Sequence, residues 1–243
     1  MKEQKKEFIK IFENSAQHRS RSEFFNDFVE CCVVAIHNRL VFDHQLESNY
    51  LRIQAGYGAV DMRNMAKLLT QVVLAFRSGY FDFLGEVFME LDLGNGRRGQ
   101  IFTPYCTSQL MVKASFHDIE KKLLSAPFVT MMDPCAGSGS MAIAFAECVA
   151  NLGYDPQSHL WVQCYDIDER CAYMTYIQLA LLGIPAEIVI GNTLTLEVRK
   201  VLRTPEHYLS NWGDKLRRQS DTEISCCDYT GSAMLEKLAH CEF

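Results

Sequence analysis

The sequence has no apolar run near the roughly 20 residues that span a bilayer, and its first residues carry charges of both signs. Its ten cysteines include no C-x-x-C pair, which argues against a zinc ribbon and against a disulfide framework. A net charge of −6 excludes nucleic-acid binding through overall basic charge. We therefore expect a cytoplasmic protein with reduced thiols and no membrane contact.

A metal site near the C-terminus is the alternative that the cysteines leave open. Cys226, Cys227, His240 and Cys241 are all metal-binding residue types. Their spacing matches no known ligand pattern, so the sequence predicts no metal site.

The hydrophobic content of 48% and charged content of 22% are ordinary for a globular protein. Apolar residues recur every three or four positions in the first third of the chain, which predicts helices over residues 1–93. The glycine-rich segment 94–99, which contains Arg97 and Arg98, is the strongest internal boundary. A helix that begins at a Thr107 or Ser108 cap is expected soon after it. We expect an N-terminal helical domain, 1–93, followed by a second domain, 94–243.

The second domain contains a strand, a glycine turn and a helix in succession. The apolar run 128–132 predicts a buried strand, and apolar residues at helical spacing follow from Met141. Gly137 and Gly139 lie between them, where they allow the backbone to approach a ligand, and the helix N-terminus offers free N–H groups. The glycine spacing fits the dinucleotide pattern G-x-G-x-x-A, a weak signal on its own. Asp133 favours a cationic ligand instead, because its carboxylate repels a pyrophosphate and attracts the ammonium group of S-adenosylmethionine.

Two segments in this order resemble the N6-adenine DNA methyltransferases. They are residues 99–104, Gly-Gln-Ile-Phe-Thr-Pro, and residues 133–139, Asp-Pro-Cys-Ala-Gly-Ser-Gly. The sequence is most similar to the modification subunit of type I restriction-modification systems, and residues 83–88 resemble the helical segment that precedes these motifs in the family. The resemblance covers about residues 80–195.

The resemblance implies a truncated Rossmann-like fold that binds S-adenosylmethionine. The Thr-Pro segment is expected to close over the methionine end of the cofactor, and the glycine turn to hold its amino-acid part. A second strand, 160–165, leads to an acidic residue expected at the ribose, and a third, 187–190, leads to an asparagine expected at the adenine ring. The implied cofactor-binding residues are Phe102, Thr103, Pro104, Asp133, Cys135, Ala136, Gly137, Ser138, Gly139, Asp166, Ile167 and Asn192.

Two of these assignments have a structural alternative. Asp166 is also a candidate cap for the helix that follows, although Asp168 is the better placed of the two. Asn192 is also a candidate turn residue.

The family's catalytic motif, an Asn or Asp followed by two prolines and an aromatic residue, is not recognisable. The chain has no Pro-Pro pair, and Thr204-Pro205 predicts a helix start that leads through Tyr208 to Trp212. About fifty residues follow Asn192, too few for further parallel strands with crossover helices. We therefore expect an exposed sheet edge after the third strand, and the catalytic residues remain unassigned. Tyr208 and Trp212 are the available rings for stacking a target base.

Two functions follow. The first is methyl transfer to adenine in DNA, with DNA held directly or through a separate specificity or partner subunit. The second is a catalytically inactive S-adenosylmethionine-binding module that acts through a partner protein or DNA. A nicotinamide enzyme ranks third, because Thr103 and Asp133 have no role in it. Self-association through the exposed edge is a further expectation.

Overall fold

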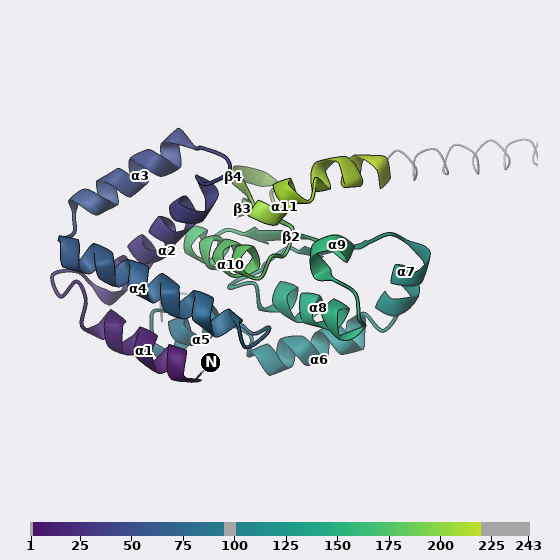
Figure 1. Ribbon diagram of the computed structural model, residues 1–243, viewed down its shortest axis with the longest axis horizontal. Helices are drawn as coiled ribbons and strands as arrows, with labels where there is room; N and C mark the ends of the chain where they lie inside the picture. The colour runs from purple at the N-terminus through teal and green to yellow at the C-terminus, as the bar shows by residue number, and fades with distance from the viewer. Residues whose placement is uncertain (1, 95–100, 220–243) are drawn as a thin grey trace, which may run out of the picture.

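The computed structural model describes residues 2–94 and 101–219, and the described residues before 95 form helices joined by loops, with no strand (Figure 1). The cap of the second helix is a capping box, in which the Ser20 hydroxyl accepts from the Glu23 amide and the Glu23 carboxylate accepts from the Ser20 amide. The helices are α1 (Lys2–Glu13), α2 (Arg21–His37), α3 (His44–Ala55), α4 (Ala59–Phe76) and α5 (Phe83–Glu90).

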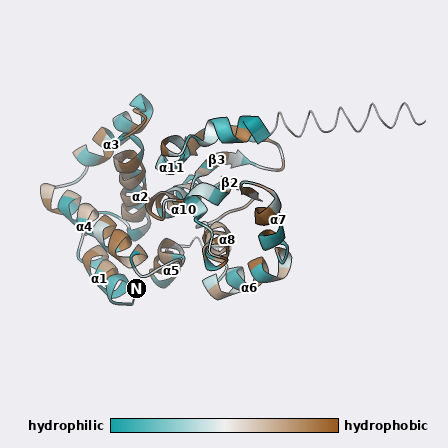
Figure 2. Ribbon diagram, turned by 45° about the vertical axis from the view of Figure 1, so that its right-hand side comes forward, coloured by the Kyte–Doolittle hydropathy of each residue, from teal (hydrophilic) through white to brown (hydrophobic). Residues whose placement is uncertain are grey.

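A cluster of phenylalanine rings joins these helices. Phe8 of α1 meets Phe28 of α2 and Phe83 of α5 edge-on, with ring centroids 5.6 and 5.7 Å apart. Phe25 of α2 packs in the same way on Phe88 of α5. Figure 2 shows α2 mostly brown, as expected for a helix surrounded by others, whereas hydrophobic and hydrophilic residues are mixed along α3.

The described residues after 100 form a four-stranded sheet in the order β1-β2-β3-β4. The first three strands are parallel, and β4 runs antiparallel to β3. Right-handed crossovers through a helix are the usual connection between parallel neighbours. The strands are β1 (Val129–Asp133), β2 (Leu160–Asp166), β3 (Ala186–Asn192) and β4 (Glu197–Arg203).

Helix α8 connects β1 to β2, followed by the short α9, and α10 connects β2 to β3. Helix α10 lies between the sheet and the N-terminal helices, where it contacts β2, β3, α2 and α5 (Figure 1). The helical part and the sheet therefore share one continuous hydrophobic core. The remaining helices are α6 (Tyr105–Ser115), α7 (Ile119–Ser125), α8 (Ser140–Asn151), α9 (Pro156–His159), α10 (Glu169–Leu181) and α11 (Pro205–Leu209).

The two faces of the sheet are covered unequally. Burial alternates along β1 and β2, and the Met132 side chain of β1 is 54% exposed. The outer edge of β1 pairs with no other strand in the part of the chain that the structure describes. The three predicted strands and the helical N-terminal region are confirmed, with small differences in their ends.

Three expectations were wrong. The edge after the third strand is not exposed, because β4 returns as a hairpin and pairs along β3. Helix α6 begins at Tyr105 after Pro104 and not at a Thr107 or Ser108 cap.

The third error concerns Trp212. Helix α11 ends at Leu209, and a new helical segment starts at Trp212, whose buried ring packs edge-on against Phe128. That ring is not available for stacking on a base.

The expectations for Arg97, Arg98 and the cysteines after residue 220 lie outside the described residues. None of the described helices is both long enough and apolar enough to cross a membrane.

Candidate functional site

A cavity of about 460 Å³ lies at the carboxyl ends of β1 and β2. In parallel α/β sheets this is the usual position for a ligand. Its lining comes from the Thr-Pro segment, the glycine turn, the end of β2 and the start of α10. The lining residues are Ile101, Phe102, Thr103, Asp133, Cys135, Ala136, Gly137, Ser138, Ser140, Met141, Asp166, Ile167, Asp168 and Cys171.

The turn between β1 and α8, residues 133–140, is the glycine corner. Gly137 has φ +59° and Gly139 has φ +91°, a backbone region that residues with a Cβ rarely adopt. A Cβ at position 137 would lie 3.2 Å from the Phe102 ring, and one at position 139 would lie 3.1 Å from the Thr175 side chain. Any other residue would therefore be strained at both positions, and its Cβ would press against a neighbouring side chain.

Two aspartates face the cavity from the ends of neighbouring strands. Asp133 ends β1 and accepts a 3.1 Å hydrogen bond from the Cys135 amide. Asp166 ends β2 and accepts from the Gly137 amide at 2.8 Å and from the Asp168 amide at 2.8 Å. Burial raises the pKa of both carboxyl groups, against the lowering effect of these hydrogen bonds. A cationic ligand would relieve the cost of keeping the two carboxylates charged in this cavity.

The Thr-Pro segment lies over the glycine corner because α6 packs along α8. The Ser108 and Ser140 hydroxyls are 2.8 Å apart in the buried contact between the two helices, and Tyr105 donates to the Glu147 carboxylate at 2.9 Å. Thr103, just before α6, is thereby placed at the same cavity as Asp133.

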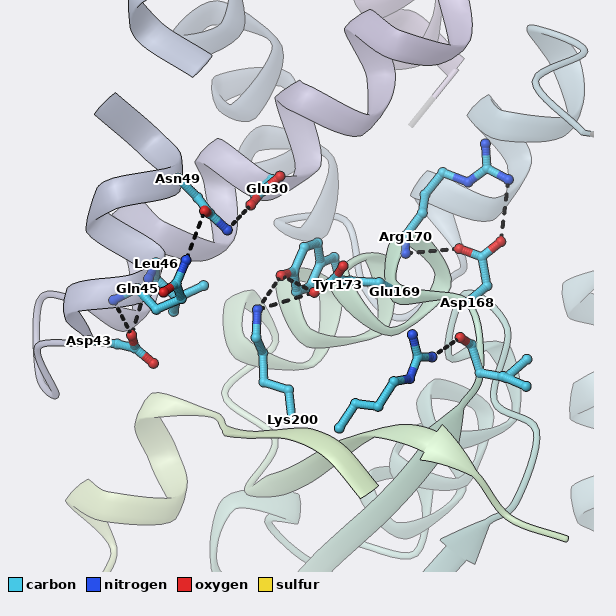
Figure 3. Close-up of polar contacts among 12 residues, drawn as sticks. Glu30, Asp43, Gln45, Leu46, Asn49, Asp168, Glu169, Arg170, Tyr173 and Lys200 are labelled. Carbon is cyan, nitrogen blue, oxygen red and sulfur yellow. Dashed lines mark hydrogen bonds and ion pairs between the residues drawn. The ribbon is translucent and has the colours of Figure 1, made fainter. Parts of the chain in front are cut away.

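The cap of α10 forms one end of the cavity. Asp168 accepts from the Arg170 amide at 3.0 Å, which confirms it as the cap, and its carboxylate pairs with the Arg170 guanidinium (Figure 3). Lys200 of β4 reaches α10, where it contacts Glu169 at 3.1 Å and the Tyr173 hydroxyl at 2.8 Å (Figure 3). The hairpin strand therefore helps to hold the helix that carries Asp168.

Nine of the twelve residues implied by the family resemblance line this cavity, and Pro104, Gly139 and Asn192 do not. Pro104 caps α6 and Gly139 caps α8. The Asn192 side chain accepts from the amides of Leu194 and Thr195, so it forms a turn after β3.

Sequence reasoning missed five lining residues: Ile101, Ser140, Met141, Asp168 and Cys171. Ser140 and Met141 directly follow Gly139 and begin α8, so their position at the start of a helix was a usable signal. Nothing in the sequence around Cys171 indicated that it would line the cavity.

The cavity has one aromatic side chain among its lining residues, Phe102. That ring packs against Phe88, with centroids 5.0 Å apart, and against Gly137. It is thus part of the cavity wall next to the glycine corner. Tyr208 is 40% exposed on α11 and does not line the cavity.

Comparison with known proteins gives one family and one solved structure. Residues 84–222, more than half of the chain, match the sequence pattern of a protein family described as N-6 DNA methylase. A protein from Listeria monocytogenes, assigned to the class I S-adenosylmethionine-dependent methyltransferases, has a structure with a TM-score of 0.44 and 14% identity, over 80% of this chain. This chain spans only 55% of that protein. A search of curated proteins finds no match.

Proposed function

The chain belongs to the N-6 DNA methylase family, and from that membership we propose that its cavity binds S-adenosylmethionine for methyl transfer to the N6 amine of adenine in DNA. S-adenosylmethionine is the cofactor of this family. The observation that carries the proposal is that Thr103 and Asp133, thirty residues apart in sequence, line one cavity at the ends of β1 and β2.

The residues present suit this cofactor. The cavity volume lies in the usual range for small-molecule sites, about 300–1,000 Å³. Asp133 and Asp166 supply negative charge for a ligand that carries a sulfonium and an ammonium group. Neither aspartate is paired with a lysine or arginine among the described residues. The N-terminus of α8, beside the glycine corner, suits the cofactor's carboxylate.

The residues that line the cavity have different proposed roles in binding the cofactor. Asp133 would hold the ammonium group, and Asp166 would accept from ribose hydroxyls through the lone pairs that its two backbone bonds leave unused. Ile167, 62% exposed, offers an apolar surface to the adenine ring. When bound, the cofactor supplies an electrophilic methyl group on sulfur. Thr103 and Phe102 line the cavity from the Thr-Pro segment and would limit the access of water.

The target adenine would have to leave the DNA stack so that its exocyclic amine can reach the methyl group. Such a base is usually held by stacking on an aromatic ring. We expect DNA to be held with a separate specificity or partner subunit, and a second copy of this chain is a further candidate partner.

A second candidate function is a catalytically inactive cofactor-binding module that acts through a partner protein or DNA. One observation favours it: Phe102, the single ring among the described residues of the cavity wall, is packed against Phe88 and Gly137. These contacts hold the half-buried ring in the wall and take up part of the surface on which a target base could stack.

Calorimetry with the full chain tests the proposed cofactor. We expect heat on titration with S-adenosylmethionine and none with NAD. Binding of NAD alone would reverse the ranking of ligands.

A transfer assay separates the two functions. With a radiolabelled methyl group, label on adenine in DNA, with the chain alone or with candidate subunits, supports the enzyme. Cofactor binding without transfer in every combination supports the module.

A further inference from the structure

A buried polar cluster beneath the glycine corner joins three parts of the chain that are distant in sequence. It consists of Asp82 and Gly85 at the start of α5, Ser138 in the glycine corner and Gln178 in α10. Asp82 is 2% exposed, Ser138 is 1% exposed and Gln178 is fully buried. Polar groups at such depth require partners, and these residues supply them to one another.

Asp82 is the common acceptor. Its carboxylate accepts from the Gly85 amide at 2.9 Å, from the Gln178 amide nitrogen at 2.8 Å and from the Ser138 hydroxyl. The contacts to Ser138 and Gln178 join positions 56 and 96 residues apart. One carboxylate therefore connects the N-terminal helices to the glycine corner.

Gln178 completes the connection. Its side-chain nitrogen also donates to the Ser138 carbonyl at 2.7 Å, and its oxygen accepts from the Leu84 amide at 3.0 Å. Three residues earlier on the same helix, the Thr175 hydroxyl donates to the Gly137 carbonyl at 3.0 Å. The backbone of the corner is thus fixed from α10, and its serine hydroxyl from α5.

Gly85 makes the cluster sterically possible. A Cβ at this position would overlap with the Asp82 carboxylate and lie 2.6 Å from the Ser138 hydroxyl oxygen. Any larger residue would therefore separate Asp82 from Ser138.

We propose that Asp82 is a positioning residue for cofactor binding, which acts by holding Ser138 and thereby the two positive-φ glycines on either side of it. Gly137 and Gly139 must keep their backbone angles for the corner to keep the shape that lines the cavity. The one local side chain that bonds the corner, Asp133, reaches only the Cys135 amide, so the glycines depend on groups from elsewhere in the chain. The inference rests on the proposed S-adenosylmethionine site. It extends that site to a residue on the N-terminal helical part that does not touch the cavity.

The test uses the full chain with Asp82→Ala, Asp82→Asn and, as a matched control, Asp43→Ala. Asp43 caps α3 through the Gln45 and Leu46 amides, so its loss removes a helix cap without touching the corner. We expect Asp82→Ala to weaken S-adenosylmethionine binding about tenfold, because three donors lose their acceptor. Asp82→Asn keeps the shape and an acceptor oxygen and should restore most of the affinity. Asp43→Ala should leave it unchanged.

Hydrogen–deuterium exchange supplies a readout that does not depend on the cofactor. In Asp82→Ala the amides of Ala136, Gly137 and Gly139 should exchange faster, while those in β2 and β3 keep the wild-type rate. Should Asp82→Ala fail to fold, Ser138→Ala removes the hydroxyl alone and should raise exchange at the same three amides.

The possible results separate the two proposals. Unchanged exchange at the corner in every folded variant overturns the role of Asp82, whether or not the cofactor binds. Faster exchange at the corner, with no cofactor binding by the wild type, overturns the proposed function and leaves the positioning role in place.

Discussion

The glycine corner and the turn after β3 both follow a strand at the same edge of the sheet, yet they are held in different ways. The corner is fixed by Asp82, Asp166, Thr175 and Gln178, which lie 29 to 56 residues away from the groups they bind. The turn after β3 is fixed mainly by Asn192, which bonds amides two and three residues along the chain. The difference separates a preorganised ligand site from an ordinary connection.

Exposure supports this contrast. Ser138 in the corner is 1% exposed, whereas Leu194 in the turn is 95% exposed and Leu196 is 80% exposed. One tertiary hydrogen bond, from the Thr193 hydroxyl to the Pro134 carbonyl at 2.7 Å, connects the two regions. Substitutions of the buried part of the corner, at Gly139 or Ser138, should therefore affect stability and binding together, and those in the turn should affect neither strongly.

The largest effect is expected from Gly139→Asp. A side chain at this position would be strained at φ +91° and crowded against Thr175. Each effect should lower the free energy of unfolding by about 1–3 kcal/mol. Because the corner would have to shift to accept this side chain, binding by calorimetry should fall more than about a hundredfold. Gly153→Asp is the matched control, because Gly153 has φ +87° and open space around its Cβ position. Equal losses of stability and affinity in the two variants would contradict the role of the corner.

The next effect is expected from Asp133→Asn. This substitution removes the charge proposed to hold the ammonium group. A hydrogen bond to a charged group contributes about 1.5–3 kcal/mol, so the affinity for S-adenosylmethionine should fall roughly ten- to 150-fold. Stability should change little, because burial already disfavours the charged form of Asp133. Asp118→Asn, outside the cavity, controls for loss of a surface charge. Wild-type affinity in Asp133→Asn would remove the reason for assigning a cationic ligand.

A pH series sharpens the same point. Burial raises the folded-state pKa values of Asp133 and Asp166. In the free protein the stability that these two carboxyl groups contribute is therefore fully present below the unfolded-state pKa. It declines as the pH rises through the folded-state pKa. A bound cation favours the charged carboxylates. The increase in Tm caused by S-adenosylmethionine should therefore grow from acidic to neutral pH, with a midpoint above that of an ordinary aspartate. Asp133→Asn should flatten this dependence, and a constant Tm increase in the wild type would rule out the carboxylates as its source.

The hydrogen-bond partners of the corner are distant in sequence, but the pattern that predicts its position is local, and this difference explains what could be predicted from the sequence. The corner is encoded locally, by an apolar run, two glycines and a helical repeat within residues 128–152, and β2 and β3 have similarly clear apolar runs. Strand β4, Glu197–Arg203, carries three basic residues and one acidic residue and follows a turn without glycine. An open edge of β3 was predicted, but no local pattern in residues 197–203 shows that this segment pairs with it, so the strand was missed.

Asp82 and Gln178 were missed for the same reason. Each has an ordinary place in its own helix, a cap and a mid-helix polar residue, and the contact between them joins positions 96 residues apart. Met132 was taken for a buried residue because parallel sheets are usually covered on both faces, and here the second face of β1 is open.

The smallest effect is expected from Leu196→Gly in the turn after β3. Leu196 has φ +60°, which costs a residue with a branched side chain about 1 kcal/mol, and its exposed side chain contributes little packing. Glycine removes that strain but adds freedom to the unfolded chain, so denaturant unfolding should show a change between zero and about 1 kcal/mol of stabilisation. Leu194→Gly is the control, because Leu194 is equally exposed but does not have a positive φ, and it should give no gain. Cofactor affinity should stay within about twofold of wild type for both. A larger loss of affinity in either variant would make this turn part of the binding site and end the distinction between the two regions.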